Sequence, residues 1–182
     1  EEAGFTEKML LRQYTQAEQT ITDRKELGET KMQLDAYRFA ERKTGSGIFY
    51  FNTATHQAFY SDEVYRLFGV VPQGLNAHLH TFVSFVHPDE RDAVRDALEQ
   101  SYRRQLPLHI QFRIHTADGK LRHIQLVTAV YFNLVGQAMI GGVYVDETEQ
   151  RAQETQLRVL DARLAEGRQL LQQLENTAGA GS

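Results

Sequence analysis

Imidazole side chains are the groups of this chain best suited to chemistry, because they bind metals and exchange protons near neutral pH. The chain has seven histidines and no cysteine. His109, His115 and His123 follow the polar side of two successive alternating stretches, so one sheet face could gather them into a metal site. The sequence places no carboxylate beside them. We therefore favour the alternative, an outer sheet face that is solvated or covered by a flanking segment.

Patterns typical of catalysis are missing from the sequence. It contains no glycine-rich phosphate loop, no His-Glu-x-x-His and no serine in a nucleophile-elbow context. His87 precedes Pro88 at a predicted helix start, where we expect it to cap the helix. The lack of cysteine excludes disulfides, thiolate metal sites and a cysteine nucleophile. We predict no catalytic residues, no metal site and no enzymatic activity.

The composition limits the size of the core and the kinds of partner that we expect for this chain. The 182 residues are 41% hydrophobic, which suffices for one well-packed core. The net charge is −4 and the 20 Lys and Arg residues form no patch, so nucleic acid is not an expected partner. Because no apolar run of about 18 residues and no signal-peptide pattern is present, we expect no membrane span and a cytoplasmic location.

The central stretch must supply the elements that position these residues. Strict alternation from 108 to 116 predicts a strand, and the turn sequence 117–120 leads into a second strand that begins at Leu121. Residues 133–136 then turn into a third strand over 137–146. We expect the second strand to face the core through four residues, Ile124, Leu126, Val130 and Phe132. Its outer face would carry Val127, Ala129 and Tyr131, with Ile140 and Tyr144 beside them.

The residues before this meander predict the other half of the same domain. Two short aromatic strands, 48–51 and 57–60, flank a loop, and Ser61 is a suitable N-cap for the helix that follows. A longer helix opens at 87–90 and turns Val94, Ala97 and Leu98 to one side. The predicted order is two strands, short helices, one longer helix and three strands.

These segments resemble the PAS sensory domains that are common in bacterial signalling proteins. The similarity rests on five motifs in the family's order, at 47–51, 60–69, 85–91, 112–124 and 141–148. It implies an α+β PAS fold over 44–148, with a five-stranded antiparallel sheet and short helices on one face. N- and C-terminal signalling helices would flank this domain.

The resemblance implies a sensory or relay function for this domain. Asp146 and Thr148 would tie the last strand to the following helix, which would pass a change to an effector domain outside this chain, such as a histidine kinase or a diguanylate cyclase. Two alternatives are a dimerisation scaffold with an empty pocket and a haem or flavin sensor of redox state or gas. His78 or His80 would be the axial ligand of a haem. No cofactor is favoured.

A pocket is expected between the sheet and its helices. Its side chains either fill the core or surround a small apolar ligand, and glycine inside the last strand would permit close approach of a ligand. The expected pocket residues are Phe49, Phe51, Leu67, Phe68, Phe82, Phe85, Phe112, Leu126, Met139 and Gly141.

The two flanks predict helices that join this domain to others. Residues 1–43 read as a helical linker, in which 20–26 is either the end of an upstream PAS module or an ordinary charged helix with a local Thr-Asp cap. Residues 149–176 predict a coiled-coil signalling helix, or else one amphipathic helix folded back on its domain, and 177–182 a flexible tail. A homodimer through the flanking helices is therefore expected, with the C-terminal seam formed by Leu157, Leu160, Leu164, Leu171 and Leu174.

Overall fold

The computed structural model describes residues 2–179, without the side chains of 2–11 and 14. The chain divides into two compact units, of which the first is the helix α1 (Glu2–Thr44) and the second begins at Gly45. Residues 20–26 lie inside α1, where the Thr22 hydroxyl donates to the Glu18 carbonyl four residues earlier. The local Thr-Asp cap is therefore not formed, because the helix continues through it.

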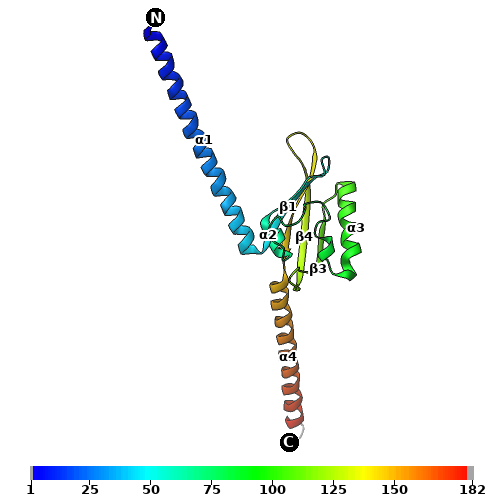
Figure 1. Cartoon of the computed structure of the whole chain (residues 1–182). Helices are drawn as coiled ribbons and strands as arrows, with labels where there is room; N and C mark the ends of the chain where they lie inside the picture. Colours follow the sequence, from blue (N-terminus) through cyan, green and yellow to red (C-terminus); the bar gives the residue numbers. More distant parts are fainter. Residues whose placement is uncertain (1, 180–182) are drawn as a thin grey trace. The chain divides into compact units, whose positions relative to one another are not determined.

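A five-stranded antiparallel sheet forms the centre of the second unit (Figure 1). Its spatial order is β2-β1-β5-β4-β3, so the first strand pairs with the last and closes the two halves of the sequence into one sheet. The predicted fold class is confirmed. The strands are β1 (Ser46–Asn52), β2 (Ala58–Tyr60), β3 (His109–His115), β4 (Leu121–Phe132) and β5 (Ala138–Asp146).

Short helices cover one face of this sheet. They are α2 (Asp62–Leu67), the 3-10 turn η1 (Val83–Phe85) and α3 (Pro88–Arg104). Val64, Val83 and Leu98, one from each element, are buried in a single cluster with the inward side chains of the strands. The core therefore lies between the sheet and these helices, and burial of this apolar surface stabilises the domain.

The two α-helices that cover the sheet, α2 and α3, differ in how their first turns are capped. The His87 ring caps α3 as expected, because its Nδ1 accepts from the Asp89 backbone N–H at 3.3 Å. Ser61 occupies the N-cap position of α2, but its side chain makes no cap bond. Its hydroxyl oxygen accepts from the Ile48 N–H at 3.1 Å instead and so ties α2 to β1. The expected capping role of the Ser61 side chain is wrong for this reason.

The hairpin between β4 and β5 extends beyond the part of the sheet that the helices cover (Figure 1). Ile124 and Leu126 are buried as predicted, and Val130 is half-buried. Phe132 is 68% exposed, so its predicted place in the core is wrong. The alternation assigned the correct side of the strand, but α2, η1 and α3, which cover that side of the sheet, do not reach the hairpin tip.

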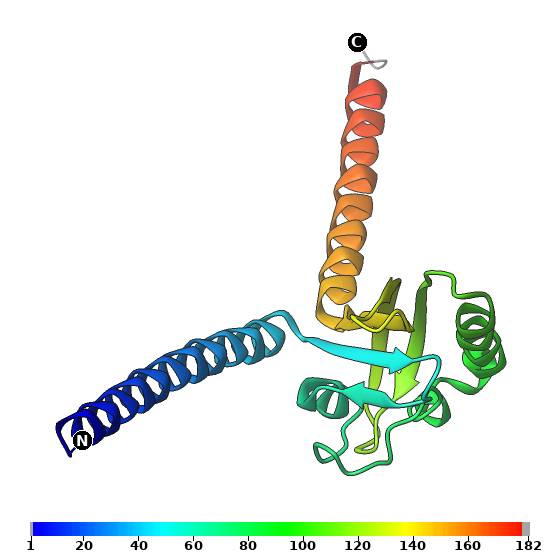
Figure 2. The same ribbon diagram turned by 90° about the horizontal axis from the view of Figure 1, so that it is seen from above.

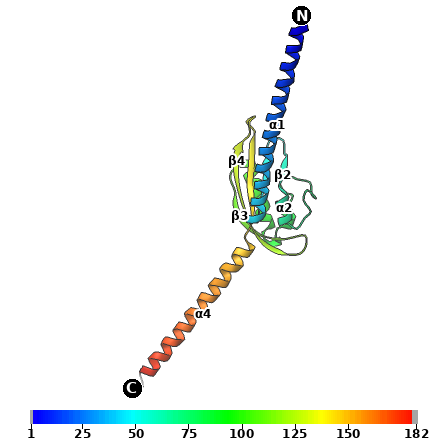
Figure 3. The ribbon, with the colours of Figure 1, turned by 90° about the vertical axis from the view of Figure 1, so that its left-hand side faces the viewer.

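The C-terminal helix α4 (Thr148–Gly179) leaves the end of β5 and runs clear of the sheet, as Figures 2 and 3 show from two directions. None of its residues is buried. The alternative of a helix folded back on its own domain is therefore wrong. Helix α4 continues three residues past the predicted end at 176, and 180–182 of the predicted tail lie outside the described residues. Among the described helices, none is long and apolar enough to span a membrane.

Candidate functional site

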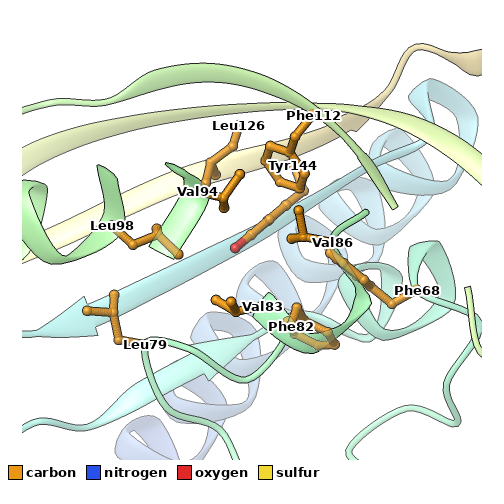
Figure 4. Close-up of a pocket in the computed structure, with 10 residues that line it drawn as sticks. All are labelled: Phe68, Leu79, Phe82, Val83, Val86, Val94, Leu98, Phe112, Leu126 and Tyr144. Carbon is orange, nitrogen blue, oxygen red and sulfur yellow. The ribbon is translucent and has the colours of Figure 1, made fainter. Parts of the chain in front are cut away.

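A small cavity lies between the helical layer and strands β3, β4 and β5 (Figure 4). Its volume is about 10 Å³, close to the space that one water molecule needs. The core of this structure is therefore nearly filled by its own side chains. The cavity is lined by Phe68, Leu79, Phe82, Val83, Val86, Val94, Leu98, Phe112, Leu126 and Tyr144.

Four of the ten predicted pocket residues line this cavity, namely Phe68, Phe82, Phe112 and Leu126. Three others, Phe49, Phe51 and Leu67, belong to the surrounding core, and Phe85 is partly buried against it. Leu98, predicted to face the core from the longer helix, also lines the cavity.

Strand β5 faces the opposite way from the prediction. Ile140 and Tyr144 belong to the buried core. A Cβ on Gly141 would lie 2.8 Å from the Tyr131 ring, whose side chain is on the outer face. Because successive strand residues alternate between faces, Met139 and Gly141 lie on the outer face, and the prediction that placed them in the pocket is wrong. Both alternating sets of β5 are largely apolar, so only the pairing with its neighbours decides which set is buried.

Tyr144 is the polar residue of the pocket, and its expected place on the outer face is wrong. It is 4% exposed, and its hydroxyl points into the cavity among side chains that are otherwise hydrocarbon (Figure 4). Burial raises the pKa of this hydroxyl well above its usual range, so the group stays protonated. The sequence offered one indication for Tyr144, its position two residues before Asp146. It did not fix the register of this strand, and so it did not fix which face Tyr144 lies on.

The residues present do not fit a haem or flavin in this core. Neither His78 nor His80 lines the cavity. His80 Nε2 lies 2.5 Å from the Glu99 carboxylate, and this hydrogen bond is the main cause that lowers the pKa of Glu99. The His78 Nδ1 accepts from the His80 backbone N–H at 3.2 Å. A flavin would in addition need several polar partners, whereas Tyr144 supplies the only polar side-chain atom among the lining residues.

The three outer-face histidines are not placed to share a metal ion. His109 and His115 lie at opposite ends of β3, and each has its own neighbour. The His109 Nε2 is 3.0 Å from the Gln125 amide, while the His115 ring lies 5.2 Å from the His87 ring. Within the described part of the chain, no three His, Asp or Glu side chains are placed to hold a metal ion.

The junction between β5 and α4 is tied by hydrogen bonds from both sides. The Asp146 carboxylate accepts from the Thr148 backbone N–H at 2.9 Å and from the Thr148 hydroxyl at 2.5 Å. The Thr148 hydroxyl oxygen in turn accepts from the His123 N–H of β4 at 2.9 Å. The first turn of α4 is therefore held to two strands at once.

Arg122 extends this junction to the helical layer. Its guanidinium lies 3.7 Å from the Asp146 carboxylate and donates to the Leu67 carbonyl at the end of α2 at 2.8 Å. Both charged side chains are less than a quarter exposed. Movement of α2 and movement of the start of α4 therefore act on the same guanidinium.

A second network, which the sequence did not indicate, holds the first turn of α4 to the outer face of β3. Gln111 donates to the Glu147 carboxylate at 3.2 Å and accepts from the Arg151 guanidinium at 2.8 Å. Arg151 also donates to Glu147 at 3.2 Å, one helical turn away. Glu147 therefore makes polar contacts with the sheet and with the next turn of α4.

Comparisons with known proteins agree with this architecture. A family model described as the PAS fold matches residues 57–143. No curated protein matches this chain. A sensory box histidine kinase/response regulator from Burkholderia thailandensis has a similar structure, with 22% identity and a TM-score of 0.51 over 71% of this chain and 98% of that one.

Two further solved structures are similar. The N-terminal domain of a diguanylate cyclase with a PAS/PAC sensor from Marinobacter aquaeolei is 16% identical, with a TM-score of 0.50 over 58% of this chain and 98% of that one. An RNA-binding light-oxygen-voltage receptor is 19% identical, with a TM-score of 0.54 over 68% of this chain. The match spans 33% of that receptor. At these identities the likeness concerns the fold.

Proposed function

Because this chain contains a PAS domain, we propose that it is a sensory or relay module of a bacterial signal-transduction protein. It passes a ligand- or partner-induced change in the core through α4 to an effector domain outside this chain. The solved structures from a histidine kinase and a diguanylate cyclase support an effector of this general kind.

The observation that carries this proposal is that Arg122 contacts both α2 and the start of α4. Its guanidinium contacts the end of α2 through the Leu67 carbonyl and the start of α4 through Asp146. A shift of α2 against the sheet changes the position of Arg122, and with it the hydrogen bonds that set the direction of α4. The coupling is physical because one charged group cannot keep both contacts when the two helices move apart.

The exposed seam of α4 supports a dimeric output. Leu157, Leu160 and Leu164 are each at least 50% exposed, and the same spacing continues to Leu171 and Leu174. Leucines at this spacing stabilise a helix when a second helix covers them. In the proposed mechanism two copies of α4 pair through this seam, and a change of direction at the junction alters how the two helices pack.

The filled core favours a second candidate, a dimerisation scaffold whose pocket holds no ligand. A cavity of about 10 Å³ admits no organic molecule without movement of its walls. In that case the stimulus comes from a partner or from the flanking helix, and the contacts of Arg122 pass the change to α4 in the same way.

A double-mutant cycle on the full chain tests the relay. Val83→Ala loosens the cavity wall, and Arg122→Gln removes the charge between α2 and α4. The measurement is amide hydrogen exchange over 148–155, the first two turns of α4. We expect the two changes to be non-additive by about 0.5–1 kcal/mol in protection free energy. The matched control is Arg95→Gln, which removes an exposed arginine of α3. Additive effects of Val83→Ala and Arg122→Gln would rule out the relay through Arg122.

A further inference from the structure

The turn between β4 and β5 presents three large apolar side chains to solvent, which we call the apolar tip. Leu134 is fully exposed, Val135 is 77% exposed and Phe132 is 68% exposed. Single exposed apolar residues are common on protein surfaces, whereas several together mark a surface that contacts a partner or a membrane. Figure 1 shows the apolar tip at the end of a hairpin that extends beyond the helices on the sheet.

The polar groups of the same turn are directed onto one another. The Asn133 side-chain oxygen accepts from the backbone N–H groups of Val135 and Gln137 at 3.1 and 2.9 Å. The Asn133 N–H donates to the Gln137 carbonyl at 3.0 Å, and the Gly136 N–H donates to the Asn133 carbonyl at 2.9 Å. The Gln137 side-chain oxygen accepts from the Asn133 amide at 3.0 Å and from Asn52 of β1 at 2.9 Å. The turn satisfies these groups itself, as a segment that enters hydrocarbon must do.

Two other segments lie at the same end of the sheet as the apolar tip. The turn 53–57 between β1 and β2 is joined to the hairpin by the Thr53 hydroxyl, which donates to the Ala138 carbonyl at 2.9 Å. The end of α3 is joined to that turn by Tyr102, whose hydroxyl lies 3.3 Å from His56 Nδ1. The three segments 53–57, 103–107 and 133–137 therefore form one end of the domain.

The charge at this end is positive. The three segments contain no Asp or Glu and two arginines, Arg103 and Arg104, both exposed. Arg103 pairs with Glu99 one helical turn earlier, at 3.3 Å. Because the hairpin extends beyond α3, the two arginines are set back from the apolar tip. Apolar side chains in front and cations behind them match the order of hydrocarbon and anionic headgroups in a membrane.

A lipid surface fits these features better than a protein surface. A stable protein interface needs complementary shape over about 800 Å² on each partner, whereas the apolar tip has three side chains on one turn. Lipid chains adapt to a projecting shape, and anionic headgroups complement Arg103 and Arg104.

We propose that the apolar tip inserts into the interface of an anionic lipid surface, with Arg103 and Arg104 at the level of the headgroups. This inference goes beyond the proposed relay and does not depend on it. The hairpin is at the Ala138 end of β5, and α4 starts after the other end, at Asp146. Contact of the tip with lipid therefore leaves the junction at Asp146 uncovered.

The test measures co-sedimentation of the full chain with two kinds of vesicle, phosphatidylcholine alone and an equal mixture of phosphatidylcholine and phosphatidylglycerol. We expect the wild-type chain to prefer the mixed vesicles, because they are anionic. Leu134→Ser should weaken binding to the mixed vesicles about tenfold, since one apolar side chain is no longer inserted. Arg104→Gln should weaken it about fivefold and leave binding to phosphatidylcholine alone unchanged.

Two valines of nearly equal exposure give a matched control. Val135 is 77% exposed and Val71 is 75% exposed. Val71 follows Phe68, whose carbonyl accepts from the Ala117 N–H at the opposite end of β4 from the hairpin. Val135→Ser should weaken binding to the mixed vesicles about fivefold, whereas Val71→Ser should not change it. All of these variants should keep the wild-type unfolding midpoint, because the replaced side chains are exposed.

The lack of cysteine in this chain permits a second readout. Leu134→Cys and Val71→Cys are each labelled with a fluorophore whose emission moves to shorter wavelength in an apolar medium. Addition of mixed vesicles should shift the emission of the label at position 134 and leave that of the label at position 71 unchanged.

Three results would overturn the inference. They are no binding of the wild-type chain to the mixed vesicles, equal binding by Val135→Ser and Val71→Ser, and an unshifted label at position 134. If the wild-type chain ignores vesicles but Leu134→Ser reduces its self-association, the apolar tip belongs to a protein interface and the lipid assignment is wrong. None of these results decides the Val83 and Arg122 cycle, which tests the relay separately.

Discussion

The guanidinium of Arg122, the second residue of β4, lies 3.7 Å from the carboxylate of Asp146, the last residue of the neighbouring antiparallel strand β5. The Asp146 carboxylate in turn accepts hydrogen bonds from the backbone N–H and the hydroxyl of Thr148. It therefore joins the end of β5, the start of α4 and the neighbouring strand β4. With Arg122 also bonded to the Leu67 carbonyl, the geometry links the helical layer to α4 without passing through the core.

Loss of the Asp146 charge should weaken this junction. Asp146→Asn keeps the shape of the side chain but removes the ion pair with Arg122 and weakens two hydrogen bonds. We expect a loss of about 1 kcal/mol in the free energy of unfolding, measured by urea denaturation, and faster amide exchange in the first turn of α4. Asp161→Asn, on the exposed part of α4, is the control and should change neither quantity.

The two adjacent glycines of β5 should respond very differently to alanine. A Cβ on Gly142 would lie 2.4 Å from the Val127 carbonyl oxygen and 2.8 Å from the Phe49 ring, neither of which has room to move. A Cβ on Gly141 would meet only the Tyr131 ring, a side chain that is 46% exposed and free to turn away.

We therefore expect Gly142→Ala to destabilise the domain by about 2–3 kcal/mol, and Gly141→Ala by less than about 1 kcal/mol. Urea unfolding of the two variants measures both values. Equal destabilisation would contradict the assignment of the two glycines to opposite faces of β5.

Glu90 should make the stability of the domain depend on pH. Burial alone would raise the pKa of the Glu90 carboxyl, but the backbone N–H and guanidinium of Arg113, at 2.6 and 2.9 Å, outweigh burial and hold the pKa below its ordinary value. Since the pKa is lower in the folded state, the contribution of Glu90 is present above pH 4.5 and is lost as the pH falls through the folded value.

The change to test is Glu90→Gln, which we expect to lower the free energy of unfolding by about 1 kcal/mol at pH 7 and by much less at pH 3. Unfolding curves of the variant and of the wild-type chain at both pH values provide the comparison. A difference that stays constant with pH would show that the charge of Glu90 contributes nothing.

The leucine seam of α4 should control self-association. Leu160→Asp places a charge at a seam position, and we expect the dissociation constant of the dimer to rise at least a hundredfold, because a charge in a buried helix interface is strongly unfavourable. Sedimentation velocity over a range of concentrations measures this. The control is Gln169→Asp, which adds the same charge off the seam. A wild-type chain that stays monomeric at about 100 μM would refute the dimer.

Local patterns predicted most of the elements of the sheet. Strict alternation predicted β3. The turn after it was predicted from Gly119, which takes a positive φ of 84° that few other residues adopt. The same reasoning failed for β5, where Gly141 and Gly142 carry no side chain and the flanking residues are apolar on both faces. It failed again for Phe132, whose burial depends on how far the helices extend along the sheet.

By itself, the sequence determined the order of the elements, the antiparallel sheet, the capping of α3 by His87 and the resemblance to PAS domains. These follow from contacts between neighbours along the chain, and side-chain period and turn chemistry encode such contacts locally. Only the tertiary structure decided that Tyr144 faces the cavity, that the outer histidines are not placed to share a metal ion, and that Arg122 contacts both α2 and Asp146. Each of these depends on strand register or on residues more than 20 positions apart, and no local pattern carries that information.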